Sequence, residues 1–370
     1  MSKTNYALDS GDELPQIEAP ELAYRPMEPK NGPLRIGLIG CGGISETHLQ
    51  AYRQAGYQVP ILCDRNLGKA EHCRDEFYPQ AEVTSDYRTV LERTDIEIVD
   101  LTPHPAERSE LIEVALLKGK HVLSQKPFVT DLNVGRQLVE LAQSQGLKLA
   151  INQNGRWAPH FAYLREVVRA GLIGRVSAVR LAVHWDHNWI QETPFDQVHH
   201  ILLYDFGIHW FDFACSLLEG RQARSVYATI ARSPTQKATP PLLAQAVIDY
   251  DDAQVSLVLD ADTPVGPEDH TFIVGSSGTA QARGPDLSRQ TVTVATASGQ
   301  FSPQLEGTWF PDGFHGAMAE LMCAIEEDRP PLHDARENLT TLSLCFAAVE
   351  SAERHQSVDP MSVAGLEGNC

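Results

Sequence analysis

The sequence has 370 residues, more than one hydrophobic core usually organises, so we expect two domains. Its 30 basic and 49 acidic residues give a net charge of −19, which would repel phosphate backbones and anionic membrane surfaces and therefore argues against both as partners. No apolar run approaches the roughly 18 residues of a membrane helix and no signal peptide is evident, so we expect a cytoplasmic protein. The seven cysteines are scattered without a C-x-x-C pair, which predicts reduced thiols.

Residues 1–33 are rich in proline and acidic residues and lack hydrophobic periodicity. Such a segment cannot bury enough apolar surface to fold alone. We expect either a disordered leader or an extended arm that lies across a partner subunit.

Residues 34–155 alternate short apolar runs with helix-length amphipathic stretches, which is typical of βαβ units. The pattern predicts a doubly wound parallel sheet, an α/β domain of the Rossmann type. Asp131 is a candidate N-cap for the last of its helices. The predicted strands are 34–40, 57–64, 96–102, 120–127 and 147–154, and the predicted helices are 44–55, 67–77, 106–119 and 131–145.

Residues 156–370 have a different pattern, in which strand-like runs are mostly joined by short turns. Short connections favour antiparallel neighbours. We expect an α+β domain with a large open antiparallel sheet, backed by the helix around His209 and by two C-terminal helices. The predicted strands are 175–189, 225–231, 244–250, 254–261, 270–278, 278–284 and 290–296, and the other predicted helices are 161–171, 316–328 and 335–355.

The stretch GLIGCGGIS ends the first strand and begins the first helix, the position that a dinucleotide fingerprint requires. Gly40 permits the tight turn, Gly42 allows close approach of a pyrophosphate, and Ser45 replaces the third glycine. Asp64 ends the second strand about 20 residues further on, where a ribose-binding acid belongs. Its charge favours NAD, whereas Arg65 could accommodate the additional phosphate of NADP.

Several motifs in order resemble the glucose-fructose oxidoreductase and inositol dehydrogenase family (Gfo/Idh/MocA). They are GLIGCGGIS, LTPHP, LSQKPFVT, NQNGRWAP and the D-x-G-x-H of YDFGIHWFD, followed by GFHGAMAELMCAIEEDRPP and ARENL. The resemblance covers about nine-tenths of the chain. It implies a two-domain oxidoreductase that uses a nicotinamide cofactor on sugars, cyclitols or similar polyols, with a second domain that binds substrate and forms a homodimer or homotetramer through the open sheet.

By this resemblance Lys126, Asp205 and His209 are the catalytic residues, and Gln125 departs from the more usual glutamate before the lysine. The predicted cofactor-binding residues are Gly40, Gly42, Gly43, Ile44, Ser45, Asp64, Arg65, Thr102, Pro103, His104, Gln125, Lys126 and Asn154. The predicted substrate-binding residues are Lys126, Asn154, Arg156, Trp157, His187, Asp205 and His209.

The catalytic residue types suit hydride transfer from an alcohol carbon. Histidine titrates near neutral pH, so His209 can take the hydroxyl proton. Lys126 follows a parallel strand, where cofactor crevices form, and its charge can stabilise a developing alkoxide. On a regular helix Asp205 would lie one turn from His209, where it could orient the substrate or favour the imidazolium, while Phe206 would face the core.

Three other interpretations concern neighbouring residues. Arg156 could hold a substrate hydroxyl or carboxylate, or form an interdomain salt bridge. Trp185 and Trp189, beside His187, could form a stacking surface for a sugar, although the pattern favours the buried face of the sheet. A metal site is not expected, because His184 and His187 should point to opposite faces of their strand.

The sequence therefore predicts an NAD(P)-dependent dehydrogenase or reductase of a sugar, sugar derivative or cyclitol. One alternative is a tightly bound NAD used transiently, in an isomerase, a lyase or a glycoside-cleaving enzyme. Another is a non-catalytic nucleotide-sensing protein, which would not need Lys126, Asp205 and His209 together.

Overall fold

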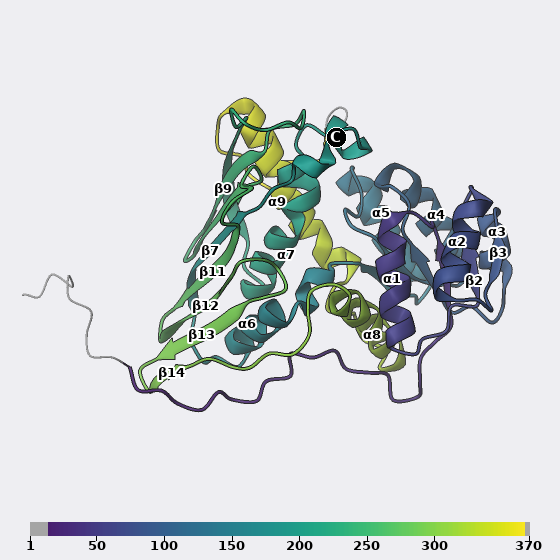
Figure 1. Cartoon of the computed structure of the whole chain (residues 1–370), viewed down its shortest axis with the longest axis horizontal. Helices are drawn as coiled ribbons and strands as arrows, with labels where there is room; N and C mark the ends of the chain where they lie inside the picture. Colours follow the sequence, from purple (N-terminus) through teal and green to yellow (C-terminus); the bar gives the residue numbers. More distant parts are fainter. Residues whose placement is uncertain (1–13, 367–370) are drawn as a thin grey trace, which may run out of the picture.

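The computed structural model describes residues 14–366. They form two sheets with helices between and around them, and the sheets stand at opposite ends of the molecule (Figure 1). Within residues 14–366, no helix combines the length and the apolar composition needed to cross a membrane.

The N-terminal domain is the predicted Rossmann domain, with a parallel six-stranded sheet in the order β3-β2-β1-β4-β5-β6. The side chains of β1, β2, β4, β5 and β6 are almost entirely buried, as expected for strands with helices on both faces. The strands are β1 (Ile36–Ile39), β2 (Ile61–Cys63), β3 (Glu82–Thr84), β4 (Ile98–Leu101), β5 (His121–Ser124) and β6 (Leu149–Ile151). The helices are α1 (Gly43–Gln54), α2 (Leu67–Phe77), α3 (Tyr87–Glu92), α4 (Pro105–Leu117) and α5 (Leu132–Ser144).

Short polar residues begin several of these helices by accepting a backbone N–H bond. Asp131 caps α5 as predicted, because its carboxylate accepts a bond from the N–H of Asn133 at 2.7 Å. Asn66 caps α2 in the same way through the N–H of Gly68. The edge strand β3 and helix α3 were not predicted, and β3 is short and partly exposed.

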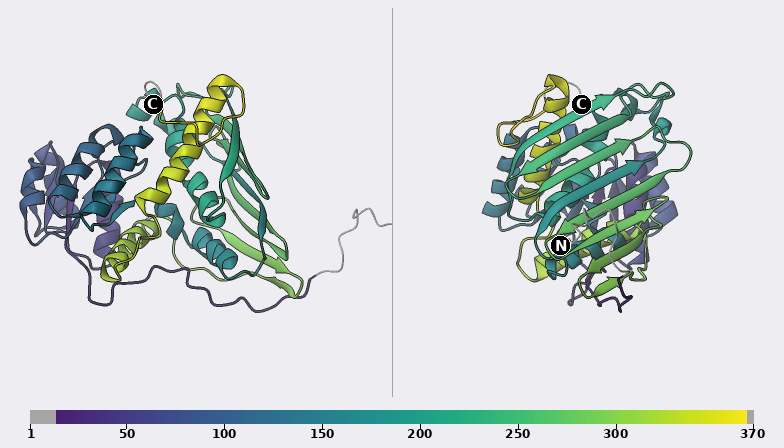
Figure 2. Two further views of the ribbon diagram at one scale, coloured as in Figure 1. Left: turned by 180° about the vertical axis from the view of Figure 1, so that it is seen from behind. Right: turned by 90° about the vertical axis from the view of Figure 1, so that its left-hand side faces the viewer.

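The second domain carries an eight-stranded sheet in the order β14-β13-β12-β11-β7-β10-β9-β8. It is mixed rather than wholly antiparallel, since β7 and β10 are parallel. Figure 2 (right) shows its outer face without helices across it, as the open-sheet prediction requires. The strands are β7 (Val176–His184), β8 (Ala223–Ala231), β9 (Leu243–Tyr250), β10 (Gln254–Asp260), β11 (Glu268–Gly275), β12 (Gly278–Gly284), β13 (Thr291–Thr296) and β14 (Gly299–Phe301).

Helices α6 (Pro159–Arg169), α7 (Ile208–Leu217) and α9 (Ala335–Arg354) lie behind the inner face of this sheet (Figure 1). Helix α8 (Asp312–Glu326) instead packs beside α1 of the Rossmann domain. Phe314, Met318 and Met322 of α8 share a buried cluster with Leu49 and Tyr52 of α1. Part of the segment predicted as the second domain therefore completes the core of the first.

Residues 14–33 of the proline-rich arm are extended along the surface of their own chain (Figure 1). Gln300 of β14 exchanges backbone bonds with it, since the N–H of Ile17 donates to its carbonyl and its own N–H donates to Pro15. Further on, the backbone N–H groups of Lys30 and Asn31 donate to Glu326 of α8, each at 2.8 Å. Residues 1–13 of the predicted arm lie outside the described residues.

Candidate active site

A cleft of about 1430 Å³ lies between the two domains. Single-ligand pockets usually measure about 300–1,000 Å³, so this cleft has room for a cofactor and a second molecule. One half is lined by the fingerprint loop and the carboxyl ends of the Rossmann strands, and the other by residues around β7 and α7. The predicted residues that line it are Gly40, Gly42, Gly43, Ile44, Asp64, Arg65, Thr102, Pro103, His104, Gln125, Lys126, Asn154, His187, Asp205 and His209.

The fingerprint loop has the shape that a dinucleotide requires. Gly40 has φ +99°, and a Cβ there would lie 2.6 Å from Oγ1 of Thr102, so only glycine fits. A Cβ at Gly42 or Gly43 would meet no atom within 4 Å, which leaves the backbone open to the cleft. No side chain caps α1, so its first N–H groups can receive a pyrophosphate. Ser45 is buried below the loop, where its hydroxyl donates to the Gly42 carbonyl.

Asp64 and Arg65 lie beside this loop, at the end of β2. The Asp64 carboxylate accepts bonds from the N–H of Cys41 at 2.7 Å and from the N–H of Asn66 at 2.8 Å, and it also faces the cleft. The exposed Arg65 forms an ion pair with Glu107 at 2.7 Å. Lys69, which the sequence analysis did not select, lines the same end of the cleft.

Lys126 and Asp205 join the two halves of the cleft. The Lys126 ammonium donates to the Asp205 carboxylate at 3.1 Å and to its backbone carbonyl at 2.9 Å, and the two side chains are 16% and 15% exposed. His209 lines the cleft nearby, and burial together with the Lys126 charge holds its imidazole pKa well below the ordinary 6.5. The imidazole is therefore neutral at pH 7, the state in which it can accept a proton.

The expectation that Asp205 favours the imidazolium of His209 is wrong, since the Asp205 carboxylate instead binds Lys126. The backbone between the two residues is also not a regular helix. Leu202–Phe206 forms a π-helical turn that ends in a bond from the Gly207 N–H to the Leu202 carbonyl at 2.7 Å, and α7 starts only at Ile208. Phe206, which directly follows Asp205 in this turn, packs against the core as predicted and also lines the cleft.

A buried polar network below the cleft was missed by the sequence analysis. His48 of α1 contacts Asp100 of β4 at 2.8 Å, and the Tyr52 hydroxyl donates to the same carboxylate at 2.7 Å. The side-chain amides of Gln125 and Asn152 approach the other ring nitrogen of His48 at 3.2 and 3.1 Å. The network holds Gln125, whose side-chain oxygen Oε1 accepts the backbone N–H of Lys126 at 2.6 Å. The sequence indicates this network only through Asp100, an acidic residue within the otherwise apolar strand β4.

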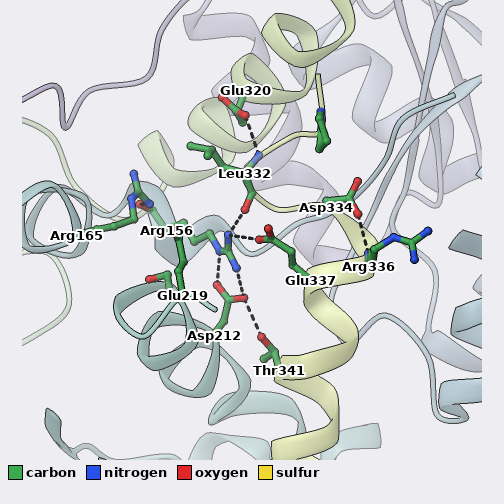
Figure 3. A network of polar contacts seen from close by, with 12 residues as sticks. Arg156, Arg165, Asp212, Glu219, Glu320, Leu332, Asp334, Arg336, Glu337 and Thr341 are labelled. Atoms are coloured by element: carbon green, nitrogen blue, oxygen red, sulfur yellow. Dashed lines mark hydrogen bonds and ion pairs between the residues drawn. The ribbon is translucent and has the colours of Figure 1, made fainter. Parts of the chain in front are cut away.

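Arg156 and Trp157 do not line the cleft. Arg156 forms a buried bidentate pair with Asp212 of α7 at 2.6 and 2.8 Å, and its guanidinium also donates to the Leu332 carbonyl (Figure 3). Trp157 is 5% exposed and packs edge-on against His333, with its ring on Gly316 of α8, where a Cβ would clash. Both residues therefore join structural elements, and we do not propose them as substrate contacts.

Trp185, His187 and Trp189 all line the cleft; Trp185 also packs against the main core, in line with the preferred prediction of a buried position, whereas Trp189 is exposed. His184 instead contacts Asp260 at 2.9 Å. Among residues 14–366, no three potential metal-ligating side chains gather in one place.

Two family models match the chain. The oxidoreductase family with an NAD-binding Rossmann fold matches residues 34–153, and the GFO/IDH/MocA C-terminal domain matches residues 161–281. The chain belongs to the Gfo/Idh/MocA family. The NAD-binding domain of this family agrees with the glycine loop and with the N-terminus of α1 described above, and it supports NAD as the cofactor.

Curated relatives include D-apiose dehydrogenase from Paraburkholderia graminis, 25% identical over 344 residues, with 88% of this chain and 89% of the relative covered. An uncharacterized oxidoreductase from Schizosaccharomyces pombe is 31% identical over 221 residues, but the match spans only 57% of either chain. Inositol 2-dehydrogenase from Paracoccus denitrificans is 24% identical and is covered over 97% of its length, against 88% of this chain.

Two similar solved structures support the fold. An oxidoreductase from Agrobacterium radiobacter in complex with NAD+, L-tartaric acid and magnesium has a TM-score of 0.79 and 21% identity, with 89% of this chain and 99% of that chain covered. Levoglucosan dehydrogenase in complex with NADH and levoglucosan has a TM-score of 0.74 and 21% identity, with 88% and 99% covered. At these identities the likeness establishes a shared fold.

Proposed function

We propose that the protein is an NAD(P)-dependent dehydrogenase or reductase that acts on a CH–OH group of a sugar, sugar derivative or cyclitol. The observation that carries the proposal is the contact between Lys126, at the end of a Rossmann strand, and Asp205, before α7, with His209 in the same cleft. An ammonium and a neutral imidazole on one interdomain cleft are the groups that alcohol oxidation requires.

In this proposal the loop from Gly40 to Gly43 and the N-terminus of α1 hold the pyrophosphate, and Asp64 binds the ribose. A bound nicotinamide supplies the hydride acceptor in oxidation, or the donor in reduction. His209 takes the proton of the substrate hydroxyl, because its lowered pKa keeps the imidazole neutral. Lys126 stabilises the negative charge that develops on the same oxygen, and Asp205 fixes the position of the ammonium.

The test is turnover of purified full-length protein with NAD or NADP and a panel of aldoses, inositols and sugar acids, followed by the absorbance of reduced nicotinamide. We expect oxidation of at least one polyol, and loss of this activity in the Lys126→Ala and His209→Ala variants. Cofactor binding without turnover of any polyol would contradict the proposal. A nicotinamide that copurifies and never exchanges would instead favour transient redox use.

A further inference from the structure

Five rings, Trp185, His187, Trp189, Phe195 and Phe206, form what we call the aromatic wall of the cleft. His187 lies at its centre, with ring centroids 4.4 Å from Trp185, 4.4 Å from Phe206 and 5.6 Å from Trp189. Phe195 continues the wall at 6.0 Å from Trp189. The rings come from three separate segments of the second domain, so the wall is built by the fold.

The aromatic wall adjoins the proposed catalytic residues. Phe206 directly follows Asp205 in the chain, and Trp185 packs at 5.1 Å against Trp210, which is the neighbour of His209. A substrate whose reacting carbon lies at His209 would therefore extend its next group along the wall.

The wall presents an apolar and uncharged surface to the cleft. Trp189 is 56% exposed, although burying an aromatic ring of this size is favourable. Burial lowers the pKa of His187 to about 4, so its imidazole is neutral at pH 7. An exposed indole beside a neutral imidazole is the kind of surface on which a flat apolar group stacks.

The ring nitrogens Nε1 of Trp185 and Nδ1 of His187 belong to the wall and have no hydrogen-bond partner among the described residues, but both are buried and so are closed to a second sugar ring unless side chains move. Asp186 accepts bonds from the backbone and side-chain amides of Asn188, at 3.0 and 2.8 Å. Asp286 accepts the N–H groups of Ser288 and Arg289, at 2.9 and 2.8 Å. Both Asn188 bonds end on Oδ1 of Asp186, so Oδ2 of this exposed carboxylate could accept a hydroxyl group, whereas both oxygens of Asp286 are already bonded within the chain.

The charges on this side of the cleft disfavour anionic substrates. Among the described lining residues, the cations Arg65 and Lys69 lie at the Asp64 end, and the buried Arg108 donates to the carbonyls of Lys126 and Pro127. Lys126 is thus the cation that faces the substrate half, and Asp205 already neutralises it. The exposed Asp186 adds negative charge beside the wall.

We propose that the aromatic wall is a subsite for an aryl group, and that the substrates are neutral glycosides with an aromatic aglycone. This inference rests on the proposed function, since the sugar ring must lie at Lys126 and His209. The aryl ring stacks on Trp189 and His187, while the sugar remains at the catalytic residues.

The test compares matched phenyl and methyl glycosides of several sugars, titrated by calorimetry into full-length protein saturated with NADH. We expect the phenyl glycoside of at least one sugar to bind about tenfold more tightly than the methyl glycoside, as stacking on exposed rings allows. Trp189→Ala should reduce this preference to less than about threefold, and Trp189→Phe should keep most of it. Leu117→Ala, which truncates an exposed apolar side chain of α4 outside the cleft, should leave the preference unchanged.

Equal affinity for both glycosides, or an unchanged preference in Trp189→Ala, would overturn the inference. A disaccharide that gains as much as the phenyl glycoside would also overturn it, because the subsite would then accept a second sugar. The two proposals fail separately. Turnover of sugars without a phenyl preference removes the aryl subsite alone, whereas a phenyl preference in binding without oxidation of any polyol removes the dehydrogenase function.

Discussion

The Lys126 ammonium lies 3.1 Å from the carboxylate of Asp205, although 79 positions separate the two residues in the chain. The contact joins the segment after β5 to the π-helical turn before α7, so it holds the proposed catalytic lysine of one domain on the segment of the other domain that carries Asp205. Since both side chains are mostly buried, the carboxylate also balances an ammonium that would otherwise be costly to hold in the cleft.

Removing the ammonium should therefore affect catalysis directly. We expect Lys126→Met to lower kcat by about 10²- to 10³-fold, the loss seen when one group that stabilises a developing oxyanion is removed. Steady-state kinetics with the best polyol of the panel measures this loss. Lys118→Met, which changes an exposed lysine after α4, is the matched control and should retain normal activity.

The pH dependence of oxidation should report the protonation of His209. Because burial and Lys126 lower its pKa below 6.5, we expect kcat/KM to stay constant as pH falls to 6.5 and to decline only below it. Lys126→Met removes the positive charge that helps to lower the pKa of His209, so the decline of its residual activity on the acid side should move to higher pH. A limb above pH 6.5 in the natural protein would contradict the proposed role of His209.

Cofactor choice should depend on Asp64, Arg65 and Glu107. Asp64→Ser removes the carboxylate that would repel a 2′-phosphate, and Glu107→Gln removes the ion-pair partner of Arg65. We expect the double variant to bind NADPH more tightly, and NADH less tightly, than the natural protein does. Titration by nicotinamide fluorescence measures both affinities, and an unchanged ratio would argue against Asp64 as the ribose ligand.

The buried pair between Arg156 and Asp212 should stabilise the fold rather than act in catalysis (Figure 3). Asp212→Ala leaves a buried guanidinium without its carboxylate, so we expect a loss of about 3–5 kcal/mol in the free energy of unfolding, measured with urea. Glu219→Ala, which breaks a more exposed pair with Arg169, should cost less than about 1 kcal/mol.

Asp269 of β11 should make stability depend on pH. Its carboxyl group is fully buried without a hydrogen-bond partner among the described residues, and burial raises its pKa to about 7 from 3.8. Between pH 3.8 and about 7 the Asp269 carboxyl group is protonated in the folded protein but ionised in the unfolded chain. The stability that this bound proton contributes is therefore present at low pH and is lost as pH rises through about 7. Asp269→Asn should unfold like the natural protein at pH 4 and be more stable at pH 8, by urea denaturation at both values.

The sequence predicted the elements whose patterns are long and local. Helix α2 begins and ends where predicted, as does strand β12, because periodicity and turn residues define both. The three-residue strands β3 and β14 were missed, since such short runs carry no period. The glycine loop, Lys126, Asp205 and His209 were all correctly assigned to one cleft, because motifs in order carry this information.

The errors and omissions arose where tertiary contacts decide a side chain's position. Phe206 and Trp185 belong to apolar patterns that fit a core as well as a cleft, and only the π-helical turn and the end of β7 direct them to the cleft. Arg156 belongs to the NQNGRWAP motif, but its partner Asp212 is 56 positions away, on a helix whose docking the sequence does not show. The aromatic wall likewise depends on three segments that meet only in the folded protein.

The arm of residues 14–33 has a mechanical consequence. It is bonded to β14 at one end, and near its other end Glu28 accepts the hydroxyl of Tyr57, which belongs to the Rossmann domain. The arm thus links the two lobes in addition to the chain crossovers after β6 and on either side of α8. An opening motion between the lobes would therefore have to keep the ends of the arm at constant separation or break some of these bonds.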